Sequence, residues 1–252
     1  MILQNLYETL VVSPIFRNEN FEIIESSVCF SVFISFWYFL DIYVPSLHEF
    51  RIYKGKDGFA SWKGREYAWL NEMLWYVIPW FVANQIWPGR REKILASAAS
   101  VDVTVELVIL QTLSSLFVYD VLFYIGHRAM HQIPVIRKLG IHDKHHSMNE
   151  KITATDAVRH TFFDGTFDVL CSVYALKIVG SHPLSRFTHN IVATWLITEA
   201  HSGYDFPWSI SRMFQGLLIS PKKHQAHHER GDKMYGKFFS VMDYCFNTYD
   251  NR

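Results

Sequence analysis

The stretch His142-Asp143-Lys144-His145-His146 decides how this chain folds and is repeated as His224-Gln225-Ala226-His227-His228 near the C-terminus. On a helix, positions i, i+3 and i+4 share one face, so each triplet is expected to aim three imidazoles into one small volume. An isolated histidine is usually a core residue, but random placement of 13 histidines among 252 residues rarely produces even one such string. Two copies predict a metal site.

Further histidines extend this pattern. His127 and His131 stand four residues apart in His-Arg-Ala-Met-His, and His201 is an isolated addition. The candidate ligands are therefore His127, His131, His142, His145, His146, His201, His224, His227 and His228. We interpret His160 as a structural residue or a hydrogen-bond partner of a ligand, and His48, His182 and His189 as structural.

The composition indicates a membrane protein with a polar domain. Half of the residues are hydrophobic, 16% are aromatic and only 19% are charged, and the mean hydropathy is +0.04. The 24 basic residues balance 24 acidic ones, which argues against a nucleic-acid partner. The three cysteines are widely separated, so neither a disulfide framework nor a thiolate site is indicated. The predicted metal site is nitrogen-rich.

Apolar runs predict an all-α fold in the form of an integral membrane helical bundle. We expect a cytoplasmic helical cap on this bundle, and we expect the cap to hold two metal ions. Residues 1–26 are expected to be an amphipathic lead-in without the features of a secretory signal. Residues 27–126 are expected to hold three spanning helices, and residues 127–252 to form the catalytic domain. Within that domain, a short membrane hairpin is expected at about 167–200. The predicted spans are 27–44, 69–87 and 103–126, and the hairpin arms are 167–179 and 187–200.

The distribution of basic residues predicts the orientation. Most of the 24 lysines and arginines lie on the side of the histidine clusters, including Lys54, Lys56, Lys63, Arg65 and Lys151. The positive-inside rule therefore places the histidines on the cytoplasmic face. The turn at Arg90, Arg91 and Lys93 is the exception. An arrangement in which the weaker segments lie in the membrane interface stays open.

The number of histidines indicates two metal ions, because a catalytic zinc needs about three protein ligands and a structural one four. Neutral imidazole suits zinc, copper, iron and nickel, so the ligand type does not identify the metal. A two-metal hydrolase is expected to use bridging carboxylates, and neither triplet contains one at a ligand position. Oxygen chemistry is favoured over hydrolysis.

In order and context, the three clusters resemble the histidine boxes of the integral-membrane fatty acid hydroxylase/sterol desaturase superfamily over roughly residues 100–250. The run His201-Ser-Gly-Tyr-Asp-Phe-Pro-Trp208 and the run Gly180-Ser-His-Pro-Leu184 resemble the sterol C4-methyl oxidase and cholesterol 25-hydroxylase branch. That resemblance favours a sterol substrate. Asp205 stands where the fatty-acid branch often has a second histidine, so its role stays open.

The resemblance implies a membrane-bound oxidoreductase with two iron ions that uses O2 to hydroxylate, oxidise or desaturate a C–H bond of a lipid. It implies that the nine box histidines are ligands, and that a membrane-bound electron-transfer protein and its reductase supply electrons at the endoplasmic reticulum. Fatty acids and sphingolipids are alternative substrates. A zinc-containing membrane hydrolase and a catalytically silent scaffold are the alternatives from other classes.

Carboxylates near the boxes are candidates to accept the second ring N–H of a ligating histidine, which fixes its tautomer and raises its basicity. For Asp120 this role is favoured because it lies in an apolar helix, where an unpaired carboxylate is costly. For Asp143 an ordinary solvated or capping role is equally expected. The candidates are Asp120, Asp143, Glu199 and Asp205.

Overall fold

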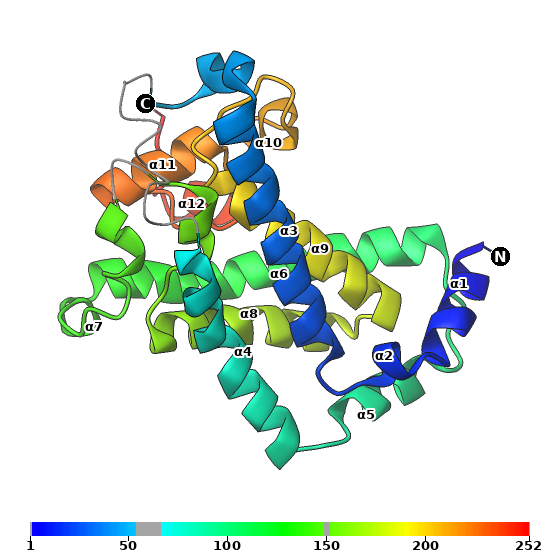
Figure 1. Cartoon of the computed structure of the whole chain (residues 1–252). Coiled ribbons are helices and arrows are strands. Elements are labelled where there is room, and N and C mark those ends of the chain that lie inside the picture. Colours follow the sequence, from blue (N-terminus) through cyan, green and yellow to red (C-terminus); the bar gives the residue numbers. More distant parts are fainter. Residues whose placement is uncertain (1, 54–66, 149–151, 252) are drawn as a thin grey trace.

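The computed structural model describes residues 2–53, 67–148 and 152–251, and it is built from helices (Figure 1). Apart from isolated bridges, these residues form no strand. Lys54, Lys56, Lys63, Arg65 and Lys151, which contributed to the predicted orientation, lie outside the described residues. The long helices are α3 (Phe21–Tyr43), α4 (Ala68–Ile86), α6 (Val105–Gln132), α8 (Phe162–Val179) and α9 (Pro183–Ala200).

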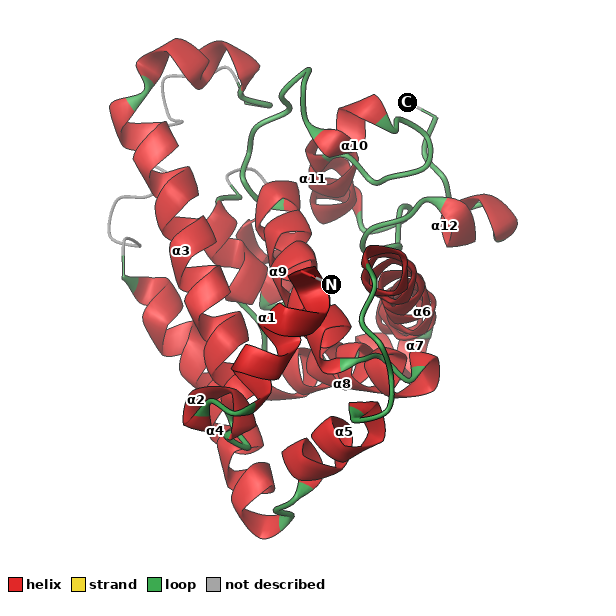
Figure 2. Cartoon of the chain, turned by 90° about the vertical axis from the view of Figure 1, so that its right-hand side faces the viewer, coloured by secondary structure: helices red, strands yellow, loops and turns green. Residues whose placement is uncertain are grey.

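Shorter helices gather at the two ends of this bundle (Figures 1 and 2). At the end that we call distal, Tyr7, Phe16, Leu95 and Leu184 form one apolar cluster that joins three short helices to the start of α9. The opposite end, called the histidine end, carries the remaining short elements. The distal helices are α1 (Ile2–Val11), α2 (Pro14–Arg17) and α5 (Arg90–Ala98); the others are η1 (Pro45–Phe50), α7 (Pro134–Arg137), η3 (His145–Met148), α10 (Ile210–Met213), α11 (Pro221–Arg230) and α12 (Val241–Cys245).

Helices α3 and α6 are the two described helices that are both long and apolar enough to cross a membrane. The predicted span 69–87 forms α4 but does not meet that standard. On α3, apolar side chains at Val28, Val32, Phe36 and Phe39 are exposed, and their spacing of three or four residues places them on one face. An exposed apolar face of this kind suits contact with lipid. The chain therefore has the surface of a membrane-associated protein.

The boundaries of two helices differ from those expected. Helix α6 continues beyond residue 126 through both His127 and His131, so the first histidine pair lies on the same helix as the apolar run. Helix α3 begins at Phe21 and includes residues assigned to the amphipathic lead-in. This start of α3 can be buried because Glu22 forms a bidentate ion pair with Arg186 of α9. The two nitrogen–oxygen distances are 2.5 and 2.8 Å.

A short internal helix, η4 (Ala154–Val158), fills the centre of the bundle, and all five of its residues are buried. It is held at its N-terminus by a capping box, in which Asp156 accepts a hydrogen bond from the backbone N–H of Thr153 at 2.8 Å. Ala154 and Val158 pack in a core cluster with Trp37 and Tyr204. This helix places small side chains directly beside the histidines.

Candidate metal centre

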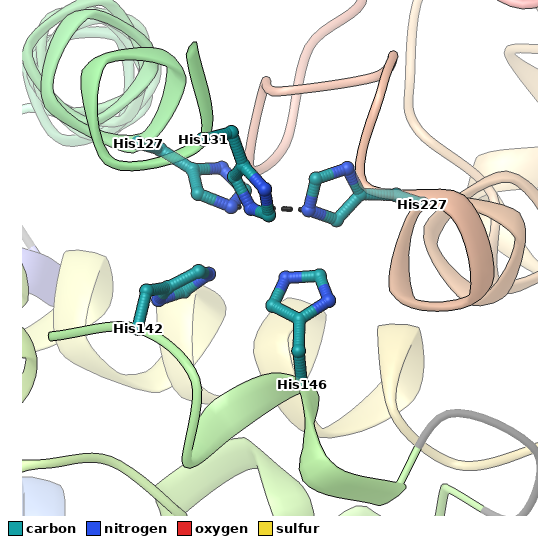
Figure 3. A group of neighbouring side chains, drawn as sticks. All are labelled: His127, His131, His142, His146 and His227. Atoms are coloured by element: carbon teal, nitrogen blue, oxygen red, sulfur yellow. Dashed lines mark hydrogen bonds between the residues drawn. The ribbon is translucent and has the colours of Figure 1, made fainter. Parts of the chain in front are cut away.

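The nine candidate histidines converge on two adjacent groups. The five-histidine group comprises His127, His131, His142, His146 and His227 (Figure 3). The four-histidine group comprises His145, His201, His224 and His228. Within each group, one ligand nitrogen from every ring lies within 4.8 Å of the others, which is a suitable arrangement for one metal ion per group.

Each His-x-x-His-His triplet contributes to both groups, which corrects the expectation of three imidazoles in one volume. Residues 141–148 form turns followed by the 3-10 helix η3, so His142 and His146 point to one group and His145 to the other. Helix α11 is regular, but His227 points away from the group that His224 and His228 form. The two triplets therefore hold the two groups together.

Hydrogen bonds fix the tautomers of the five-histidine group. The Nδ1 of His127 donates to the backbone carbonyl of Tyr235 at 2.9 Å, and that of His227 donates to the carbonyl of Lys233 at 2.7 Å. Because a carbonyl only accepts, both Nε2 atoms carry lone pairs, yet they lie 3.1 Å apart (Figure 3). Two lone pairs at that distance repel each other unless a cation binds between them.

The four-histidine group shows the same arrangement. The Nδ1 of His201 donates to the carbonyl of Ile197 at 2.8 Å, and that of His145 donates to the carbonyl of Arg159 at 3.3 Å. Their Nε2 atoms are 3.3 Å apart, and the Nε2 of His224 is 3.0 Å from that of His201. The backbone thus orients the lone pairs toward a shared centre, as expected for metal ligands.

Burial keeps these imidazoles in the neutral form that binds metals. Burial, together with the neighbouring imidazoles, lowers the pKa of His145, His224 and His228 well below the usual range, and burial lowers that of His201 to about 4. The rings are therefore neutral at physiological pH. An all-imidazole set of this kind fits iron, zinc, copper or nickel.

Asp164, at the start of α8, is a carboxylate that the sequence analysis missed. Its Oδ2 accepts a hydrogen bond from the Nδ1 of His142 at 2.8 Å, and the pair is buried. This contact leaves the Nε2 of His142 with no hydrogen-bond partner among the described residues, directed at the five-histidine group. The available signal was an aspartate three residues after Thr161, which caps the helix.

The carboxylates predicted to support the histidines lie elsewhere or act weakly. Asp120 accepts hydrogen bonds from the backbone N–H groups of residues 237–239, so it positions that segment. Asp205 pairs with Arg212, at 3.4 Å, and Glu199 interacts with the side chain of Trp195. Burial lowers the pKa of His146, and the negative charge of Asp143 partly opposes that shift.

Two cavities meet beside the four-histidine group. The first, which we call the histidine cavity, is lined by His145, His201 and His224 together with Ala157 and Ile197. The second, called the apolar chamber, lies between α3, α4, α8 and α9 and has mostly apolar walls, including Phe30, Trp80 and Val173. Ala157 and Ile197 line both cavities.

A buried ion pair crosses the wall between the two cavities. Lys237 lines the histidine cavity, and its ammonium pairs with Asp168, which lines the apolar chamber. The hydroxyl of Tyr119 donates to the same Asp168 oxygen at 2.7 Å. Lys237 also lies 4.3 Å from the ring centroid of Phe123. Ala157, Ile197 and this ion pair therefore lie at the boundary between the chamber and the histidines.

Comparisons with known proteins agree with this site. A cholesterol 25-hydroxylase-like protein of Danio rerio is 26% identical over 96% of this chain and 93% of its own length. The cholesterol 25-hydroxylase of Mus musculus is 25% identical over 98% of this chain and 83% of its own length. A very-long-chain aldehyde decarbonylase of Oryza sativa is 29% identical over 56% of this chain and 53% of its own.

No solved structure matches this chain. The sequence profile of the fatty acid hydroxylase family matches residues 112–248, a segment that contains all nine histidines of the two groups. Its relatives include hydroxylases, so the match supports an oxidoreductase. The chain belongs to the fatty acid hydroxylase family.

Proposed function

We propose that this protein is a membrane-bound di-iron oxygenase that uses O2 to hydroxylate, oxidise or desaturate a C–H bond of a lipid, with a sterol as the favoured substrate. The observation that carries the proposal is the contact between an apolar chamber and two groups of neutral, oriented imidazoles. Two bound iron ions would supply the capacity to activate O2 and attack an unactivated C–H bond. The nine box histidines would be the ligands.

The protein's own residues would prepare the site for that chemistry. Backbone carbonyls and Asp164 hold each ligating ring in the required tautomer. Ala157 and Ile197 let a hydrocarbon approach the four-histidine group and keep water out, which protects a reactive site from side reactions. An iron ion, unlike a tetrahedral zinc, accepts more than four ligands, so the four-histidine group would leave a position for a further ligand, and this group faces the chamber.

We further propose that the protein lies in the endoplasmic reticulum membrane with the histidine end on the cytoplasmic face. The required electrons would come from a membrane-bound electron-transfer protein and its reductase. The exposed apolar faces of α3 and α6 and the basic residues near the histidine end support this placement.

The test is lipid profiling of cells that express the intact chain or the His145→Ala variant, each with an electron-transfer partner. We expect an oxygenated or desaturated lipid only with the intact chain, and iron in the purified protein. A new product in the sterol fraction would support the favoured substrate, and one among fatty acids or sphingolipids would replace it. Natively bound zinc without O2 consumption would overturn the oxygenase proposal in favour of a hydrolase or a scaffold.

A further inference from the structure

Helix α10 and the turns on either side of it direct large apolar side chains outward. Five of them, Trp208, Ile210, Met213, Phe214 and Leu217, are each between 48 and 70% exposed, and we call them the α10 patch. Four of the five stand at positions i, i+3, i+4 and i+7, a spacing that places side chains on one face of a helix. None of the five carries a charge. The patch is therefore an apolar surface on one side of a short segment.

The polar residues of the same segment point inward. Ser209 and Ser211 are buried, and their hydroxyl oxygens are 3.0 Å apart. The guanidinium of Arg212 pairs with the carboxylate of Asp205 at 3.4 Å. A surface helix that faces water usually has the opposite arrangement, with its apolar side chains toward the core and its polar side chains toward water. The inverted polarity of α10 indicates apolar surroundings outside the protein.

The segment is held in this position at both ends. Before α10, the backbone N–H of Asp205 donates to the carbonyl of Phe50 at 2.9 Å. After it, the backbone N–H of Ser240 donates to the carbonyl of Leu217 at 2.8 Å. These contacts fix the outward direction of the patch, so its exposure is built into the fold.

The patch lies near the end of α3 (Figure 1). The ring of Trp208 makes an edge contact with that of Phe50, at a centroid distance of 4.9 Å, and Phe50 ends the short helix η1 that follows α3. Of the two helices suited to crossing a membrane, α3 is the less buried, and its last turns expose Phe39 and Tyr43. Tryptophan and tyrosine concentrate where a spanning helix leaves the hydrocarbon. Trp208 thus continues an aromatic surface that begins on α3.

We infer that the α10 patch lies in the membrane leaflet at the histidine end, where it contacts the boundary between phospholipid headgroups and acyl chains. The inference rests on the proposed membrane placement but not on the proposed oxidation chemistry. The segment joins His201 to His224, which are both members of the four-histidine group. Lipid contact at α10 therefore fixes how far this group lies from the membrane surface.

The first test uses the unmodified chain in nanodiscs of phosphatidylcholine. A fraction of the lipid carries a diazirine near the carboxyl end of one acyl chain, and peptide mass spectrometry locates the adducts after illumination. We expect adducts on α3 and on residues 208–217, but not on residues 229–233, which follow the histidines of α11. Adducts on α3 without any on residues 208–217 would overturn the inference.

The second test measures depth with an environment-sensitive nitrobenzoxadiazole label on Met213→Cys. The matched control is Asp232→Cys, an exposed position just beyond α11. We expect nitroxide-bearing phosphatidylcholine to quench the first label severalfold more strongly than the second. A background without native cysteines is needed, and it must keep the metal content of the unmodified chain. Its substitutions are Cys29→Ser, Cys171→Ala and Cys245→Ser.

A label on Val32→Cys, near the middle of α3, calibrates the depth. An interfacial helix lies only about 5–10 Å below the headgroup boundary. We therefore expect a nitroxide near the headgroup to quench the label at Met213 more than one near the chain terminus, and the reverse order at Val32. The reverse order at Met213 as well would contradict an interfacial position.

The outcomes separate this inference from the proposed function. Quenching at Val32 without quenching at Met213 would overturn the α10 contact and leave the membrane placement intact. Quenching at neither position would overturn both. A change in label emission that appears only in discs holding two chains would assign the patch to a second copy and overturn the lipid contact. Quenching at Met213 in a chain that forms no oxidised lipid would support the contact and contradict the oxygenase alone.

Discussion

The two histidine groups share the same ligand chemistry but differ in number, burial and surroundings. The four-histidine group is wholly buried and faces the apolar chamber through Ala157 and Ile197. The five-histidine group includes the half-buried His131 and His146. A metal with fewer protein ligands retains more room for a further ligand. The four-histidine group is therefore better placed to contact a substrate. The five-histidine group would leave fewer coordination positions open on its metal.

The largest expected effect comes from removing one imidazole from each group. His145→Ala takes a ligand from the four-histidine group, and His227→Ala takes one from the five-histidine group. We expect both variants to lose turnover, because the triplets hold the groups together, and each to bind less than the full amount of metal. Elemental analysis and product formation measure these effects, with membrane insertion as the control. Full activity in either variant would contradict the two-metal assignment.

The histidines illustrate what can be predicted from sequence. Their spacing is local, so it identified eight members of the two groups, and His201 was added as an isolated candidate; the apolar runs located the five long helices to within six residues at each end. The division of each triplet between groups was not predictable, because it depends on residues 141–148 forming turns and a 3-10 helix rather than an α-helix. The i, i+3, i+4 rule applies only within regular helices.

Contacts between residues distant in sequence account for the other differences. Asp164 supports His142 from 22 positions away, whereas the carboxylates predicted from the sequence lie nearer to a box. Glu22 was placed in the amphipathic lead-in rather than in a buried helix, because its partner, Arg186, lies in α9. In both cases only the folded chain brings the charge and its partner together. Buried ionic pairs of this kind leave no local pattern.

The ion pair between Lys237 and Asp168 belongs to the four-histidine side, and Lys237→Met is expected to have the next largest effect. Both side chains are buried, so the change leaves the Asp168 carboxylate without its cation and costs about 3–5 kcal/mol of stability. Unfolding of the variant and of the unmodified chain in detergent measures this loss of stability. The double variant Lys237→Met/Asp168→Asn should recover part of the loss. A double variant less stable than the single one would contradict the pairing argument.

On the five-histidine side, Asp164→Asn weakens the support of His142. We expect metal affinity and turnover to fall by about 10–100-fold, because the carboxylate holds the ring tautomer. Competition with a chelator measures the affinity. Asp205→Asn is the control, since Asp205 pairs with Arg212, and we expect it to retain metal. An equal loss in both variants would show that the effect is not specific to the carboxylate at His142.

The smallest expected effect concerns His160, which lies between the two groups. Its ring stacks on His145 at a centroid distance of 4.4 Å, and its Nε2 is 3.8 Å from the Asp164 carboxylate. Its Nδ1 is hydrogen-bonded to the hydroxyl of Tyr76. Burial lowers the pKa of His160 to about 3, so the ring is neutral and carries one proton. With that proton on Nε2, facing Asp164, the lone pair on Nδ1 accepts from Tyr76 and none remains for a metal.

His160→Phe tests this assignment, because phenylalanine keeps a ring against His145 but removes both nitrogen contacts. We expect the metal content to equal that of the unmodified chain and stability to fall by about 1–3 kcal/mol, since the buried Tyr76 hydroxyl loses its partner. Tyr76→Phe/His160→Phe removes the stranded hydroxyl as well and should restore part of that stability. Loss of one metal ion from His160→Phe would instead make His160 a fifth ligand of the four-histidine group and erase the difference in ligand number between the two groups.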